Sequence, residues 1–295
     1  MIPPVRLFVF GLGYSALAFV RSTQRQLAWI GGTVRDPDKA ARLRSEGIDT
    51  IVFDGETASV GVAGALAKAS HCLVSIAPGE GGDPVLAHHA DDIMTAENLR
   101  WIGYLSTVGV YGDYGGAWVS ERLTPHPRPG RSTRRLQAEA AWSALADNRG
   151  VPLAILRIAG IYGPGRNALK SLADGKARRI VKPGQVFNRI HVDDIAQAIA
   201  AALNKKADGI FNLADDAPAP PQDIVSFAAE LMGVPPPPAV SFEEADLSPM
   251  ARSFYGDNKR VSNRRLRKDL GVALRYPTYR EGLSAMWQEG NWRGN

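Results

Sequence analysis

The sequence predicts an α/β fold built on a doubly wound parallel sheet, with a smaller C-terminal lobe. Short apolar segments alternate with helical patterns through the first two thirds of the 295-residue chain. Strands separated by helical segments form parallel βαβ units. The first apolar segment is followed at once by Gly11-Leu12-Gly13 and then by a helical pattern, which is the order expected where such a sheet begins.

Each expected strand is a run of four to six mainly apolar residues, and each expected helix shows apolar residues at helical spacing. The strands are expected at Arg6–Phe10, Trp29–Val34, Thr50–Phe53, Cys72–Ile76, Trp101–Ser106 and Leu153–Arg157. The helices are expected at Ser15–Arg21, Asp38–Glu46, Val60–Ala69, Val85–Asn98 and Ser132–Asp147.

The alternation weakens after Gly163-Pro164-Gly165, and the four prolines at 235–238 interrupt it further. We therefore expect a sheet domain at residues 1–165, to which residues 188–216 return. Residues 166–187 and 217–295 are expected to form the smaller substrate-binding lobe.

Composition restricts the classes of function. The net charge of +5 and the pI near 9.4 come mostly from scattered arginines, and no helix-turn-helix, zinc or RNA-recognition pattern accompanies them. We expect no nucleic-acid partner. Cys72 is the single cysteine, which excludes an intramolecular disulfide and a cysteine-based zinc site, and no metal site is expected. No apolar run is long enough for a membrane helix, so a cytoplasmic protein without a membrane partner is expected.

The turn after the first strand has the spacing G-x-G-x-x-A, with Gly11, Gly13 and Ala16. In a dinucleotide fingerprint the first glycine permits the tight turn and the second lets the backbone approach a pyrophosphate at the helix N-terminus. Tyr14 and Ser15, which open the helix, are expected to contact the cofactor as well.

The end of the second strand selects between NAD and NADP. Arg35 lies where a cation accommodates the 2′-phosphate of NADP, and Lys39 would add a second cation. The alternatives are that Asp36 reads the ribose of NAD, or that Asp36 or Asp38 caps the following helix. NADP is the expected cofactor, with NAD as the alternative.

The stretch from Leu105 to Glu139 resembles the extended and atypical short-chain dehydrogenase/reductases, which are NAD-dependent epimerase/dehydratase-like proteins. The resemblance rests on Leu105–Gly112 with its Val-Tyr-Gly turn, on Val119-Ser120-Glu121 and on Arg131–Arg135, and it continues through His191–Ala196, Gly209–Ala214 and the C-terminal Tyr276–Gly282. It covers almost the whole chain. The spacing places Arg131 where that family has its catalytic tyrosine and Arg135 where it has its lysine.

This departure limits the chemistry that the resemblance implies. A guanidinium stays protonated and accepts no hydrogen bond, so Arg131 can stabilise an oxyanion but cannot abstract a proton. The resemblance implies catalytic roles for Thr107 and for Arg135, which would hold the cofactor ribose, while Tyr111 is the nearest phenol by sequence. Further candidates for a displaced acid or base are Tyr114, Glu121, His126, Tyr162 and His191.

The resemblance also implies contacts around the cofactor and the substrate. Asp54 would lie near the adenine, and Ala77, Pro78 and Ser106 would line the cofactor path. Arg166, Arg189 and His191 are expected on the substrate side, where arginines favour an anionic small molecule. Two functions are left open: an NADP-dependent oxidoreductase or epimerase acting on an anionic or nucleotide-sugar substrate, and a non-catalytic NADP-binding sensor. A homodimer through residues 138–145 is a further expectation from the resemblance.

Overall fold

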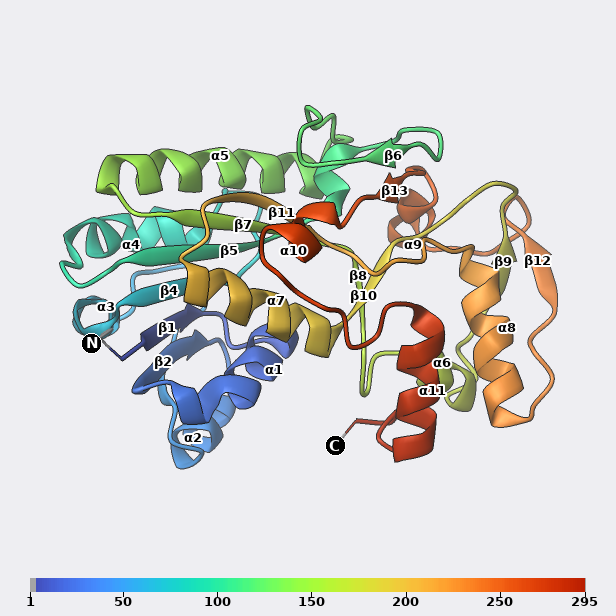
Figure 1. Cartoon of the computed structure of the whole chain (residues 1–295), viewed down its shortest axis with the longest axis horizontal. Coiled ribbons are helices and arrows are strands. Elements are labelled where there is room, and N and C mark those ends of the chain that lie inside the picture. The colour runs from blue at the N-terminus through green and yellow to red at the C-terminus, as the bar shows by residue number, and fades with distance from the viewer. Residues whose placement is uncertain (1–3, 295) are drawn as a thin grey trace.

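The computed structural model describes residues 4–294, which form a sheet lobe and a smaller lobe (Figure 1). The strands of the main sheet are β1 (Arg6–Phe10), β2 (Trp29–Val34), β3 (Asp49–Val52), β4 (His71–Val74), β5 (Trp101–Thr107), β7 (Leu153–Ile158) and β11 (Gly209–Leu213). Their order across the sheet is β11-β7-β5-β4-β1-β2-β3, and all neighbours run parallel. The predicted doubly wound parallel sheet is confirmed.

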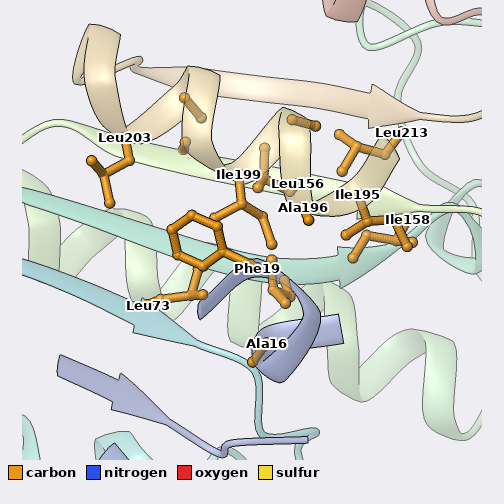
Figure 2. Packing of buried hydrophobic residues seen from close by; sticks show 14 of the residues in the cluster. Ala16, Phe19, Leu73, Leu156, Ile158, Ile195, Ala196, Ile199, Leu203 and Leu213 are labelled. Carbon is orange, nitrogen blue, oxygen red and sulfur yellow. The ribbon is translucent and has the colours of Figure 1, made fainter. Parts of the chain in front are cut away.

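Helices cover both faces of this sheet. One face carries α1 (Tyr14–Thr23), α2 (Pro37–Ser45) and α7 (Val192–Lys205), and the other carries α3 (Val62–Lys68), α4 (Pro84–Thr95) and α5 (Arg131–Arg149). Figure 2 shows how α1 and α7 pack together: Ala16 and Phe19 lie beside Ile195 and Ile199, all of them buried. The first helix is therefore tightly fixed, and so is the turn that precedes it.

The strands and helices predicted for the first two thirds are all present, within three residues of their predicted bounds. Local chemistry accounts for their ends. The Asp83 carboxylate accepts hydrogen bonds from the backbone N–H groups of Val85 and Leu86 at 2.9 and 3.2 Å, so α4 begins at Pro84. Helix α5 ends where Gly150 adopts a φ of 67°.

The smaller lobe has a core of its own, in which α6 (Ala168–Ala173), α8 (Pro221–Met232) and α11 (Tyr279–Glu289) pack around Leu169, Leu283 and Met286. Short parallel pairs complete the fold: β8 (Gly160–Tyr162) with β10 (Arg189–His191), β9 (Arg179–Val181) with β12 (Ala239–Ser241), and β6 (Trp118–Val119) with β13 (Arg260–Val261). The remaining elements are α9 (Pro249–Phe254), α10 (Arg264–Lys268) and the 3₁₀ turns η1 (Gln24–Gln26) and η2 (Val108–Tyr111). Within residues 4–294, none of the helices has the length and apolar character needed to cross a membrane.

Candidate functional site

A cleft of about 870 Å³ opens at the carboxyl ends of β1, β2, β3 and β4. Ligands of open parallel sheets bind at this edge, outside the carboxyl ends of the strands. The cleft is lined by the glycine turn, by the segment after β2 with Lys39, by Phe53–Glu56, by most residues of 75–84, and by Ala87 and His88. Its walls therefore come from four consecutive βα connections.

The glycine turn is pinned to β2 and faces the cleft. Gly11 has a φ of 89°, and a Cβ there would lie 2.8 Å from the side chain of Ile76. Its N–H donates to Thr33 Oγ1 at 2.9 Å, and the next N–H, of Leu12, donates to the Thr33 carbonyl at 2.8 Å. A Cβ on Gly13 would meet no atom within 4 Å, so the space beside this residue is open to a ligand.

The same turn is positively polarised. Gly13 caps α1 without a side-chain hydrogen bond, and the first turn of the helix carries no acidic residue. The Lys39 ammonium donates to the Leu12 carbonyl at 2.8 Å; burial lowers its pKa, and the positive charge of Arg42 acts in the same direction. The open backbone and the helix N-terminus fit the pyrophosphate of a dinucleotide, and the Lys39 ammonium adds a positive charge between this turn and the segment after β2.

Asp36 and Arg35, which follow β2, take different positions in the structure. Asp36 accepts a hydrogen bond from the backbone N–H of Asp38 at 2.9 Å and caps α2. Arg35 lines the cleft with an exposed side chain, and it forms no ion pair with any residue of the described range. A free guanidinium therefore stands in the cleft while the neighbouring carboxylate is engaged elsewhere.

Other expected cofactor residues lie in different places. Asp54 and Ala77 line the cleft, and hydrogen bonds from backbone N–H groups, first that of Glu56, lower the pKa of Asp54. Pro78 is not part of the lining, although both of its sequence neighbours are. Ser15 is buried in α1, next to the open turn. The glycine-rich 79–82 turn also lines the cleft, although only its composition indicates it in the sequence; the N–H of Gly79 donates to the Gly82 carbonyl at 2.8 Å.

Two expected site residues belong instead to a buried network beneath the end of β5. The Tyr111 phenol is fully buried and donates to Asn212 Oδ1 at 2.8 Å, and burial raises its pKa. The Ser106 hydroxyl donates to Glu139 Oε1 at 2.5 Å. Neither residue is part of the lining of the cleft, and both hydroxyls are bonded within the protein; the catalytic role of Tyr111 and the cofactor contact of Ser106 stay predictions.

Thr107, Arg131 and Arg135 lie around the start of α5, outside the lining of the cleft. Thr107 Oγ1 accepts the Gly109 N–H at 3.1 Å, and the Arg131 guanidinium lies over the ring of Phe254, 5.7 Å from its centroid. Arg135 donates to the Leu105 carbonyl at 2.7 Å and to Tyr104 Oη at 3.2 Å. The catalytic role of these three residues remains a prediction.

Two of the expected substrate residues make hydrogen bonds within the protein. Arg189 donates to the carbonyls of Phe187 and Ala219 at 3.0 and 3.3 Å. His191 is buried; its Nδ1 accepts the Asp193 N–H at 3.2 Å, and burial lowers its pKa to about 4. Their role in substrate binding stays a prediction. Arg166 is exposed and lies in the loop that follows β8.

Three of the further acid or base candidates, Glu121, Tyr114 and Tyr162, use their side chains in hydrogen bonds within the protein. Glu121 accepts the backbone N–H of Asn212 at 2.8 Å. Tyr114 and Tyr162 donate to the carbonyls of Thr124 and Thr278 at 3.0 and 3.3 Å. His126 lies in the loop before α5, where its backbone N–H bonds to the Tyr111 carbonyl at 3.3 Å.

The parallel sheet, the glycine turn and the cleft define a Rossmann-type dinucleotide-binding protein. A family model, NAD dependent epimerase/dehydratase family, matches residues 87–214. A solved structure of a functionally unknown conserved protein from Silicibacter pomeroyi DSS is 47% identical, with a TM-score of 0.87, and the match covers 97% of this chain and 99% of that one. The chain therefore matches the NAD-dependent epimerase/dehydratase family over residues 87–214.

Two curated relatives are more distant. Protein YeeZ of Escherichia coli strain K12 is 26% identical over 283 residues, which cover 92% of this chain and 96% of YeeZ. The 3-diazoavenalumate denitrifying reductase of a Streptomyces species is 31% identical over 141 residues. That second match spans 44% of this chain and only 45% of the reductase.

Proposed function

We propose that the protein is an NADP-dependent oxidoreductase or epimerase of this family and that its substrate is an anionic small molecule, such as a nucleotide sugar. One observation carries the cofactor preference. Arg35 and Lys39 both line the cleft as cations, while the Asp36 carboxylate, the group that would read the ribose of NAD, caps α2. A guanidinium and an ammonium suit a 2′-phosphate dianion.

The residues of the chain would divide the work as follows. Gly11 and Gly13 would hold the pyrophosphate, Arg35 and Lys39 would hold the 2′-phosphate, and Asp54, which lines the cleft, would lie near the adenine. The bound nicotinamide would supply the hydride chemistry. Thr107 and Arg131 would polarise the oxygen of the substrate, and the proton that balances the hydride transfer would come from solvent water. The name of the Streptomyces relative, a reductase, supports reduction as the chemistry.

Titration with NADPH and NADH, followed by nicotinamide fluorescence, tests the proposal. Arg35→Gln should weaken NADPH binding by about 10- to 100-fold, because a charge-assisted hydrogen bond contributes roughly 1.5–3 kcal/mol. NADH affinity should stay within about twofold, since NADH has no 2′-phosphate. Arg25→Gln, which removes an exposed cation of η1 outside the cleft, is the matched control. Equal losses for both cofactors would refute phosphate reading by Arg35.

A non-catalytic NADP sensor is the second candidate function. The burial of three tyrosine side chains favours it. Tyr104, Tyr111 and Tyr162 are buried, and burial raises the pKa of each. None of them replaces the base missing at position 131. A sensor would bind NADPH with the same selectivity but would oxidise it no faster with a panel of anionic carbonyl compounds and nucleotide sugars than without them.

A further inference from the structure

We infer that Arg166, from the smaller lobe, binds the pyrophosphate of the dinucleotide, and that Tyr14 positions the loop that carries Arg166 beside the glycine turn. The inference rests on the proposed function, since it needs a dinucleotide in the cleft. It replaces the substrate-binding role expected for Arg166 from the sequence. It also makes the cofactor site a product of both lobes.

Tyr14 connects the glycine turn to the loop after β8. It is the first residue of α1, directly after Gly13, and its hydroxyl donates to the Pro164 carbonyl at 2.9 Å across 150 residues of sequence. Gly163 makes room for the phenol: a Cβ at this position would lie 2.6 Å from Tyr14 Oη and 2.6 Å from Val192 Cγ1. The contact between turn and loop is thus built into both segments.

The loop itself is held rigidly. Gly163 and Arg166 exchange two backbone hydrogen bonds of 3.0 Å. Asn167 donates through Nδ2 to the Gly163 carbonyl at 2.8 Å and to the Trp292 carbonyl at 2.7 Å. The backbone of Arg166 is therefore fixed relative to Pro164, and through Pro164 relative to Tyr14.

The charges around Tyr14 and Arg166 favour the binding of an anion. Burial raises the pKa of Tyr14 to about 12, and the positive charge of Arg166 opposes that rise, so the guanidinium acts on the phenol beside the turn. Asp193 acts on Tyr14 in the opposite direction, but it lies 3.6 Å from Arg275. Arg166 is exposed and has no ion-pair partner among residues 4–294. Tyr14 and Arg166 lie outside the lining of the cleft but next to its glycine turn, where a free guanidinium suits a phosphate group bound at the helix N-terminus.

Calorimetric binding of two cofactor fragments tests the inference without any turnover. ADP-ribose carries the pyrophosphate and no 2′-phosphate, whereas 2′,5′-ADP carries the 2′-phosphate and no pyrophosphate. Arg166→Gln should weaken the binding of ADP-ribose about tenfold, as expected for loss of one charge-assisted contact, and should weaken the binding of 2′,5′-ADP far less. Arg35→Gln should show the reverse pattern. Lys176→Gln, an exposed cation of the same lobe outside the cleft, should change neither affinity.

Tyr14→Phe tests whether Tyr14 positions the loop that carries Arg166. It removes only the hydroxyl, so it separates this role from an effect on the stability of the fold. Tyr14→Phe should weaken the binding of ADP-ribose about threefold. The double variant with Arg166→Gln should bind ADP-ribose no more weakly than Arg166→Gln alone, since Tyr14 acts through Arg166. Arg166→Lys, which keeps the charge, should recover part of the affinity.

The outcomes separate this inference from the function on which it rests. Unchanged ADP-ribose affinity in Arg166→Gln, with normal binding by the unaltered protein, would overturn the inference and leave the proposed function standing. Absence of NADPH and ADP-ribose binding in the unaltered protein would overturn both. Fully additive losses in the double variant would overturn the positioning role of Tyr14.

Discussion

At the scale of single residues, the least exposed ion pair near the candidate site joins Arg157 and Glu139. Arg157 Nη2 lies 2.7 Å from Glu139 Oε2, and their side chains are 2% and 4% exposed. Glu139 also accepts the Ser106 hydroxyl, and the Arg157 guanidinium lies 4.8 Å from the centroid of the Tyr111 ring. This pair therefore fixes the end of β5 against α5, where the catalytic positions are expected.

Glu139→Gln should destabilise the protein by about 3–5 kcal/mol, because it leaves a buried guanidinium without its counter-charge. Urea unfolding followed by circular dichroism measures this loss. Glu97→Gln, at an exposed carboxylate, should change the free energy of unfolding by less than about 0.5 kcal/mol. A loss below about 1 kcal/mol for Glu139→Gln would contradict the assigned role of the pair.

At the scale of elements, the cofactor cleft depends on how β1 turns into α1. The turn is held by β2 through Thr33, by α2 through Lys39 and by the loop after β8 through Tyr14. Helix α1 is in turn held by α7, as Figure 2 shows. The position of the turn is therefore set by β2 and α2, which follow it closely in sequence, and by two segments from the second half of the chain.

Gly11→Ala should destabilise the protein by roughly 1–3 kcal/mol, because the residue has a φ of 89° and the added Cβ would lie 2.8 Å from Ile76. Because the variant shifts the turn, it should also weaken the binding of NADPH and of NADH by similar factors. Thermal unfolding and cofactor titration measure the two effects. Gly64→Ala is the control: Gly64 lies inside α3 with no atom within 4 Å of its Cβ position, so the variant should be slightly more stable. A stable Gly11→Ala that binds cofactor normally would contradict the prediction.

At the scale of the whole molecule, the chain buries titratable groups between its lobes. Asp215 follows β11 where the chain passes into the smaller lobe, and it is 2% exposed. Its Oδ1 accepts the Ala217 N–H at 3.1 Å, while its Oδ2 has no hydrogen-bond partner within the described residues. Burial raises its pKa to about 8. The folded protein therefore favours the protonated acid at neutral pH.

Asp215→Asn should stabilise the protein at pH 7. The pKa of Asp215 is higher in the folded chain than its unfolded value of 3.8. The group therefore contributes to the free energy of unfolding below pH 3.8, and that contribution is lost as the pH rises toward 8. The neutral amide keeps the acceptor for Ala217 and avoids the loss, so a gain of about 2 kcal/mol or more is expected at pH 7 and little at pH 4. Denaturant unfolding at both pH values measures it, with Asp91→Asn as the exposed control. The same gain at both values would show that ionisation is not the cause.

The sequence by itself determined the parallel sheet, the glycine turn and the cation after β2. These features depend on apolar periodicity and on spacings of a few residues, and both can be read along the chain. The tertiary structure alone decided which groups the side chains of Ser106 and Tyr111 bond to. Their hydroxyl groups bond to residues 33 and 101 positions away, so that local spacing carries no sign of the partner. The contact of Tyr14 with Pro164 depends in the same way on how the two lobes meet.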